Sequence, residues 1–208
     1  MVLGSCNFNF NYNNSKIERN DCFKLIDYFY SNGGRIIDSA ANYHSHEIIK
    51  EWLTQNKGNE LKIITKVWKS SEIVQCFEEL EVDKLYCIMA RNSKDNDLLY
   101  ALKDKQKQGL IEKVGISIYY QEELIQNVNA FHVPPTRWVF NNIETMELHS
   151  DIYIRSFWNY NKFYMKDEVG LLYKTFKQFD RPDLNHQIEA VVGVDNLEQL
   201  KEDMEIFK

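Results

Sequence analysis

The feature that most constrains the fold is a regular alternation of short apolar runs with longer segments of helical periodicity. Short apolar runs predict buried strands, and apolar residues spaced three or four positions apart predict amphipathic helices. The predicted strands are residues 2–8, 35–38, 61–66, 84–89, 114–117, 137–140, 151–157 and 189–194. The predicted helices are residues 21–32, 45–55, 70–80, 98–108, 121–129, 143–149, 166–179 and 196–207. The alternation therefore gives eight strand-helix pairs.

Strands separated by helices pair in parallel through right-handed crossovers, and eight such units can close on themselves as a (β/α)₈ TIM barrel. With 208 residues the chain is close to the lower end of about 200 residues for this fold, so its loops must be short. An open doubly wound sheet is the alternative, but it would normally show a glycine-rich turn after its first strand, and residues 4–7 offer a single glycine, Gly4. We expect one compact α/β domain over residues 1–208.

Three ionisable side chains lie at or just beyond the ends of predicted strands. Asp38 ends the second strand, Tyr43 lies in the loop after it, and Lys66 ends the third. A tyrosine phenol has an ordinary pKa of about 10, and it becomes a useful acid near neutral pH only if a nearby ammonium stabilises its anion. We expect Lys66 to be that ammonium and Asp38 to hold it. The three residues therefore predict a proton-donating site.

In a barrel the carboxyl ends of all strands share one face, where barrel enzymes place their active sites. Ser117 and the Arg155-Ser156 pair lie at or near the ends of later strands and would join the same mouth. Ala90 directly follows the fourth strand, where a fourth catalytic group would be expected. Aromatic residues near several strand ends suit a sugar or planar ring, although packing at the rim explains them equally well: Trp68, Tyr119, Phe157, Trp158 and Tyr160.

Charge and composition exclude several classes of partner. The net charge of −6 and the pI near 5.4 give no positive field for nucleic acid or an anionic membrane. No stretch of about 18 apolar residues and no secretory leader is present, so we expect a cytoplasmic protein. The cysteines lack metal-ligand spacing and predict reduced thiols, with no metal site: Cys6, Cys22, Cys76 and Cys87. Oligomeric state stays open.

Four motifs, in order, resemble the aldo-keto reductase superfamily over nearly the whole chain. The first resembles its Asp-Thr-Ala-x-x-Tyr-Gly-x-Ser-Glu signature, the second its Thr-Lys segment, and the third its Gly-Val-Ser stretch. The fourth is similar to the loop and helix that hold the adenosine phosphate of the cofactor. They occupy residues 38–47, 64–67, 109–117 and 192–200.

The resemblance implies that hydride passes from the nicotinamide of NADPH to a carbonyl carbon while Tyr43 protonates the carbonyl oxygen. It makes Lys66 the tuner of the tyrosine and Asp38 the anchor of the lysine. It puts the histidine that orients the oxygen at Ala90, whose methyl group cannot donate a hydrogen bond. It assigns cofactor binding to Ser117, Arg155, Ser156, Gly193, Asp195, Asn196 and Gln199.

Several positions depart from the family pattern. His44 replaces the glycine after the tyrosine, Asn92 replaces a proline, and residues 131–170 form a shorter region than the family carries. His44 and His46 could stand in for the missing histidine, but surface positions are the simpler interpretation. Loss of one preorganised donor typically costs about 10²–10³ in rate.

Two functional hypotheses follow. The first is an NADPH-dependent reductase of a small carbonyl compound, sugar or nucleotide-sugar. The second is a barrel that has lost reductase chemistry and acts as a binding or accessory protein, or in proton transfer without hydride. The match at residues 193–199 supports the first hypothesis, whereas Ala90 and the shortened C-terminal half support the second.

Overall fold

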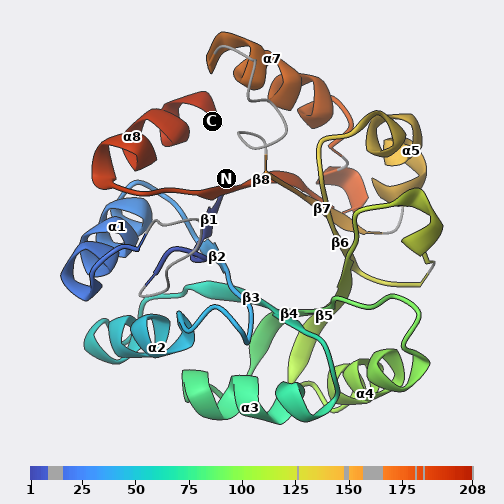
Figure 1. Ribbon diagram of the computed structural model, residues 1–208, viewed down its shortest axis with the longest axis horizontal. Coiled ribbons are helices and arrows are strands. Elements are labelled where there is room, and N and C mark those ends of the chain that lie inside the picture. The colour runs from blue at the N-terminus through green and yellow to red at the C-terminus, as the bar shows by residue number, and fades with distance from the viewer. Residues whose placement is uncertain are drawn as a thin grey trace.

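Eight parallel strands close into a barrel in the computed structural model (Figure 1), which describes residues 1–8, 16–125, 127–147, 150–156, 166–180, 182–184 and 186–207. Each strand pairs with its neighbours in chain order, and β1 closes the ring by pairing with β8. This confirms the predicted (β/α)₈ barrel. The strands are β1 Val2–Gly4, β2 Ile36–Asp38, β3 Lys62–Val67, β4 Leu85–Ala90, β5 Ile111–Ser117, β6 Ala130–Val133, β7 Asp151–Arg155 and β8 Ile188–Gly193.

Helices form a ring around the outside of the barrel (Figure 1). In the described part of the chain they are α1 Arg19–Ser31, α2 His46–Gln55, α3 Ser71–Leu80, α4 Asn96–Lys107, α5 Arg137–Glu147, α7 Lys166–Lys177 and α8 Leu197–Ile206, with the short 3-10 turns η1 Gln121–Glu123 and η2 Pro182–Leu184. None of the helices in these ranges is long and apolar enough to cross a membrane.

Strand alternation divides the buried side chains into two layers. The inner layer fills the barrel and takes residues from most strands, among them Val2, Ile64, Met89, Tyr153 and Val191. The outer layer lies between the strands and the helices and is much larger. Gly115 makes room in the inner layer, because a Cβ at this position would lie 2.8 Å from the backbone oxygen of Ala130. Side chains that point inward at the strand ends therefore reach the mouth of the barrel.

A buried polar network closes the opposite end of the barrel. Asp151, at the start of β7, accepts hydrogen bonds from Lys113 Nζ at 2.6 Å, from Tyr153 Oη at 3.0 Å and from Tyr86 Oη at 3.2 Å. A buried carboxylate needs such partners, because an unpaired charge in the interior is costly. These bonds keep polar groups satisfied far from the mouth.

The sixth strand lies earlier than the sequence predicts. Residues 137–140 were expected as a strand, but they begin α5, and the strand is Ala130–Val133. Pro134 and Pro135 end the strand, because proline has no N–H to donate to a sheet. The helix starts directly afterwards, with Phe140 N donating to Thr136 O at 3.1 Å.

The segment 121–129 was expected to be helical and is not. Among its described residues, 121–125 and 127–129, the turn η1 is the one helical element, and the Glu123 carboxylate accepts hydrogen bonds from the backbone N–H groups of Tyr119 and Tyr120. Asn127 has a φ of 63°, which a right-handed helix does not allow. Part of two other predicted elements, at His149 and Phe157, lies outside the described residues, as do Trp158 and Tyr160.

Candidate active site

A buried ion pair lies at the centre of the barrel mouth. Lys66, on β3, donates from Nζ to Asp38 Oδ1 at 2.6 Å and to the Ser39 backbone oxygen at 2.6 Å. Both side chains of the pair are almost fully buried. Two neighbouring strands create this contact, since Asp38 ends β2 and pairs in register with Ile64, two residues before Lys66. The structure thus brings together the acid and the amine that the sequence singles out.

Tyr43 lies above this pair in the loop between β2 and α2. The loop is fixed to β3 because Ala41 N donates to Lys66 O at 3.0 Å, and Tyr43 N donates to Ala40 O at 3.0 Å. Lys66 Nζ lies 5.3 Å from the centre of the half-buried Tyr43 ring. His44 follows with a φ of 57°, a conformation that favours glycine and so explains why the family pattern has glycine there.

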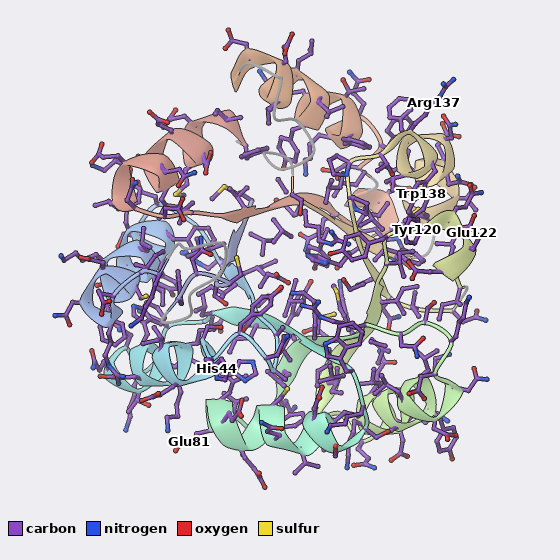
Figure 2. All side chains as sticks on the ribbon, in the orientation of Figure 1. His44, Glu81, Tyr120, Glu122, Arg137 and Trp138 are labelled. Carbon is purple, nitrogen blue, oxygen red and sulfur yellow. The ribbon has the colours of Figure 1, made fainter. Side chains whose placement is uncertain are left out.

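Neither of the two histidines after Tyr43 takes the place of the missing histidine beside the phenol. His44 is exposed near the start of α2 (Figure 2). His46 is buried, which corrects the expectation of a surface position, and its Nδ1 lies 2.6 Å from Glu79 Oε2 and its Nε2 3.0 Å from Thr65 Oγ1. Both ring nitrogens of His46 are therefore committed to helix α3 and the outer side of β3.

The tyrosine is less acidic than the sequence leads one to expect. Burial first, and the negative charge of Asp38 second, raise the pKa of Tyr43 to about 12, while Arg91 opposes the rise. Lys66 was expected to lower this pKa. Because its ammonium is paired with Asp38 at 2.6 Å, the carboxylate offsets its field at the phenol. Burial also lowers the pKa of Lys66.

Ala90, the expected position of the missing histidine, does not face the mouth. In the barrel register Ala90 pairs with Val67 and Ile116, and all three side chains belong to the outer layer. Paired residues of parallel strands share one face, and successive residues alternate between faces. The residue after Ala90 turns inward: Arg91 donates from Nη2 to Tyr43 Oη at 3.0 Å.

His132 is a site residue that sequence reasoning missed. It lies inside the barrel on β6, where Nδ1 is 3.0 Å from Ser117 Oγ and Nε2 is 3.8 Å from Asp38 Oδ1. Nε2 is buried without a hydrogen-bond partner among the described residues. A histidine inside the apolar run 130–133 could have indicated a site residue, but the sequence pattern predicted the sixth strand at residues 137–140 instead.

The buried state of His132 predicts an acid-sensitive fold. Burial, followed by the charges of Lys66, Arg155 and Arg91, holds its pKa well below 6.5. The folded state then stays unprotonated while the unfolded state gains a proton, so stability falls as the pH drops below about 6.5, by about 1.4 kcal/mol per pH unit for this group. Urea unfolding between pH 7.5 and 5 checks this: His132→Gln should have the shallower pH dependence, and equal slopes would contradict it.

Arg155 and Ser156 lie at the end of β7, as predicted. Arg155 is buried, donates from Nη2 to Ile118 O at 3.0 Å, and stacks on Tyr119 with its Cζ 3.8 Å from the ring centre. Ser156 has a φ of 63°. The stacking fixes the guanidinium in the mouth, beside the cluster formed by Lys66 and His132.

The loop predicted to hold the adenosine phosphate joins β8 to α8. Asn196 caps the helix, its side chain accepting from Gln199 N at 2.9 Å, while Asp195 N donates to the Gln199 side chain at 2.8 Å. Gly193 pairs with Gly4 across the closing seam of the barrel. Asp195 also accepts a hydrogen bond from Asn7 at 2.8 Å. These hydrogen bonds order the loop between β8 and α8 at the mouth of the barrel.

Solved structures of distant sequence share this fold. A Pseudomonas aeruginosa protein assigned to the aldo-keto reductases gives a TM-score of 0.80 at 17% identity, covering 99% of this chain and 87% of the other. An aldo-keto reductase of Bombyx mori, in complex with NADP, gives 0.70 at 14% identity, covering 100% and 83%. No match was found among curated proteins.

The sequence model of the aldo/keto reductase family matches residues 1–152. The match covers most of the chain and carries Asp38, Tyr43 and Lys66, the three residues that meet at the mouth. It confirms the resemblance to the family and includes the first three motifs, whereas the fourth, at residues 192–200, lies outside the matched range. The chain belongs to the aldo/keto reductase family, and its class of function is that of a carbonyl oxidoreductase.

Proposed function

We propose that the protein reduces a small carbonyl compound with NADPH and uses Tyr43 as the proton donor. The observation that carries the proposal is the phenol held over a buried Lys66–Asp38 pair, with Lys66 Nζ 2.6 Å from Asp38 and 5.3 Å from the centre of the Tyr43 ring. A donor with a pKa raised to about 12 stays protonated at neutral pH, so the phenol carries a proton to donate at the start of each turnover. Its proton is released only to a strongly basic oxygen, such as the one that forms during reduction.

The cofactor, when bound, supplies hydride to the carbonyl carbon. Tyr43 then gives its proton to the carbonyl oxygen, and the positive charges of Arg91 and Lys66 stabilise the tyrosinate that remains. Asp38 keeps the ammonium of Lys66 in place. The product is an alcohol, and the phenol regains a proton from solvent before the next turnover.

The mouth fits a nicotinamide ring better than the last loop fits a 2′-phosphate. The buried Nε2 of His132 has no partner in the described chain and can receive a polar group of a ligand. By resemblance, Ser117, Arg155 and Ser156 line the cofactor path. Residues 193–199, however, contain no lysine or arginine and carry Asp195 and Glu198 at the start of α8. Carboxylates repel a phosphate dianion, whereas they can accept hydrogen bonds from the hydroxyls of a ribose.

Calorimetric titration tests the proposal directly. We expect NADPH and NADH to bind with dissociation constants in the micromolar range, near −8 kcal/mol, and with less than a tenfold difference, because no cation in residues 193–199 selects the phosphate. An absence of binding by both cofactors up to about 1 mM, near −4 kcal/mol, would overturn the reductase.

Asp195→Lys is the matched variant for this titration. Replacing the carboxylate by an ammonium near the start of α8 should tighten NADPH by about tenfold and leave NADH within about twofold, since the phosphate is the only difference between the two. Equal changes for both cofactors would show that the adenosine phosphate binds elsewhere.

The hypothesis of a barrel repurposed for binding or for non-redox proton transfer rested on Ala90 and on the shortened C-terminal half. The side chain of Ala90 lies in the outer layer, and the inward residue beside it is Met89, which pairs with Lys66 and cannot donate a hydrogen bond either. We place this hypothesis second because the carboxylate, the phenol and the amine all lie together at the mouth. The substrate belongs to the small carbonyl compounds, a class that includes sugars. No disulfide joins the four cysteines, all of which lie in the described residues, and this fits the reducing compartment of the cytoplasm, where we place the reaction.

A further inference from the structure

Arg91 presents an incompletely satisfied cation to the reacting centre. One nitrogen, Nη2, donates to the neutral Tyr43 phenol at 3.0 Å, and Nε is buried without a hydrogen-bond partner among the described residues. No carboxylate in the described ranges forms an ion pair with Arg91. An arginine is always charged, and a buried donor without an acceptor is costly. The open side of the guanidinium is therefore suited to an anionic ligand.

The charge balance of the mouth points the same way. The positive charges of Lys66, Arg91 and Arg155 act together on His132. Asp38, the carboxylate beside Lys66, is already bonded to that lysine at 2.6 Å and forms no ion pair with Arg91 in the described part of the chain. The Trp68 ring lies 5.4 Å from Arg91 Cζ and is half exposed, so it restricts the guanidinium from the solvent side. The guanidinium is thus held at the entrance with its charge uncompensated.

We infer that Arg91 binds the carboxylate of the substrate and that the protein acts on 2-oxo acids, an inference that rests on the proposed reductase function. In a 2-oxo acid the carboxylate is bonded directly to the carbonyl carbon. An arginine 3.0 Å from the proton donor can therefore hold the carboxylate while Tyr43 faces the carbonyl oxygen. Arginine and carboxylate match as a two-pronged pair, with two parallel N–H···O bonds.

The reaction balances with this substrate. Hydride from the cofactor forms the new C–H bond at the carbonyl carbon, and the C=O double bond becomes a single bond. The Tyr43 proton forms the O–H bond, so the product is a 2-hydroxy acid and the cofactor leaves oxidised. The carboxylate is unchanged and stays on Arg91 throughout, which fixes the orientation of the carbonyl group during transfer.

A pair of substrates that differ only in charge tests the inference: pyruvate and its methyl ester. We expect the ratio of kcat/KM for pyruvate to that for methyl pyruvate to fall about 10- to 100-fold in Arg91→Gln, the equivalent of lost hydrogen bonds to a charged group. Arg91→Lys should give an intermediate ratio, because it keeps the charge but not the planar fork. Arg137→Gln is the control, an exposed arginine on the outside of α5 (Figure 2), and should leave the ratio unchanged.

Binding of oxamate, an amide analogue of a 2-oxo acid that is not reduced, separates this inference from the proposed function. Wild-type protein should bind oxamate in the presence of NADPH, and Arg91→Gln should lose most of that affinity. If no carbonyl compound is turned over while oxamate binds through Arg91, the reductase proposal fails and the carboxylate site stands. An unchanged substrate ratio in Arg91→Gln overturns the inference, as does lost NADPH affinity without loss of oxamate binding, since the anion is then a cofactor phosphate.

Discussion

Tyr43→Phe should lower kcat/KM for carbonyl reduction by about 10²–10⁴, the usual contribution of a positioned general acid. The variant removes one oxygen atom, the one that accepts a hydrogen bond from Arg91 at 3.0 Å. Without it, the cations beside the phenol are Arg91, whose guanidinium does not give up a proton, and Lys66, whose ammonium is bonded to Asp38 and to the Ser39 oxygen. No proton is then delivered at the position of the carbonyl oxygen. Steady-state kinetics at neutral pH, with NADPH titration of the same variant, measure the effect.

Tyr100→Phe is the matched control, because Tyr100 lies on α4 and is 75% exposed. It should reduce carbonyl compounds at the wild-type rate. If Tyr43→Phe retains NADPH affinity and loses turnover, the loss belongs to proton transfer rather than to folding. Turnover within a factor of two of wild type in Tyr43→Phe would rule out the tyrosine as the acid.

The sequence predicted that the acid, the phenol and the amine would lie near one another, because each lies at or just after the end of a clear apolar run. Asp38 and Lys66 end short strands whose neighbours in the chain are also neighbours in the barrel, so parallel register brings them together. Tyr43 lies five residues after Asp38, and so short a segment keeps its side chain near the end of the strand. The local sequence pattern and the order of the strands were sufficient to predict that these residues lie together. The barrel was predictable for the same reason, because each strand pairs with its neighbours in the chain.

Ala90 lies on the outer face because strand side chains have a period of two. A shift of one residue along a strand moves a side chain from one face to the other, and an apolar run does not show which of its residues face inward. The two neighbours of Ala90 face inward: Met89 pairs with Lys66 in the inner layer, and Arg91 donates a hydrogen bond to Tyr43. The sequence pattern alone could not decide between these positions.

His132 and the pKa of Tyr43 could not be predicted for a different reason. Both depend on contacts between groups that are distant in the chain. The histidine meets Ser117 from β5 and Asp38 from β2. The pKa depends on burial and on the balance between Asp38 and Arg91, which only the closed barrel defines.

The second large effect concerns stability: Asp38→Asn should lower the free energy of unfolding by about 3–5 kcal/mol at pH 7. The Lys66 side chain is 1% exposed, and its ammonium bonds to one carboxylate and one backbone oxygen. Asparagine keeps the shape of Asp38 and removes the charge, which leaves an uncompensated ammonium in the interior. Urea unfolding followed by circular dichroism measures the loss.

The pH dependence of Asp38→Asn identifies the cause of that loss. Burial already lowers the pKa of Lys66, and removal of Asp38 lowers it further, while the unfolded value stays near 10.4. Between the two values the unfolded state binds more protons, so stability rises with pH and the deficit against wild type should shrink as the pH approaches about 10. The double variant Asp38→Asn, Lys66→Met carries no charge at either position of the pair and should recover most of the stability at pH 7. If the double variant is as unstable as the single one, the pair stabilises the barrel through its packing, and the charge of Lys66 is not the origin of the loss.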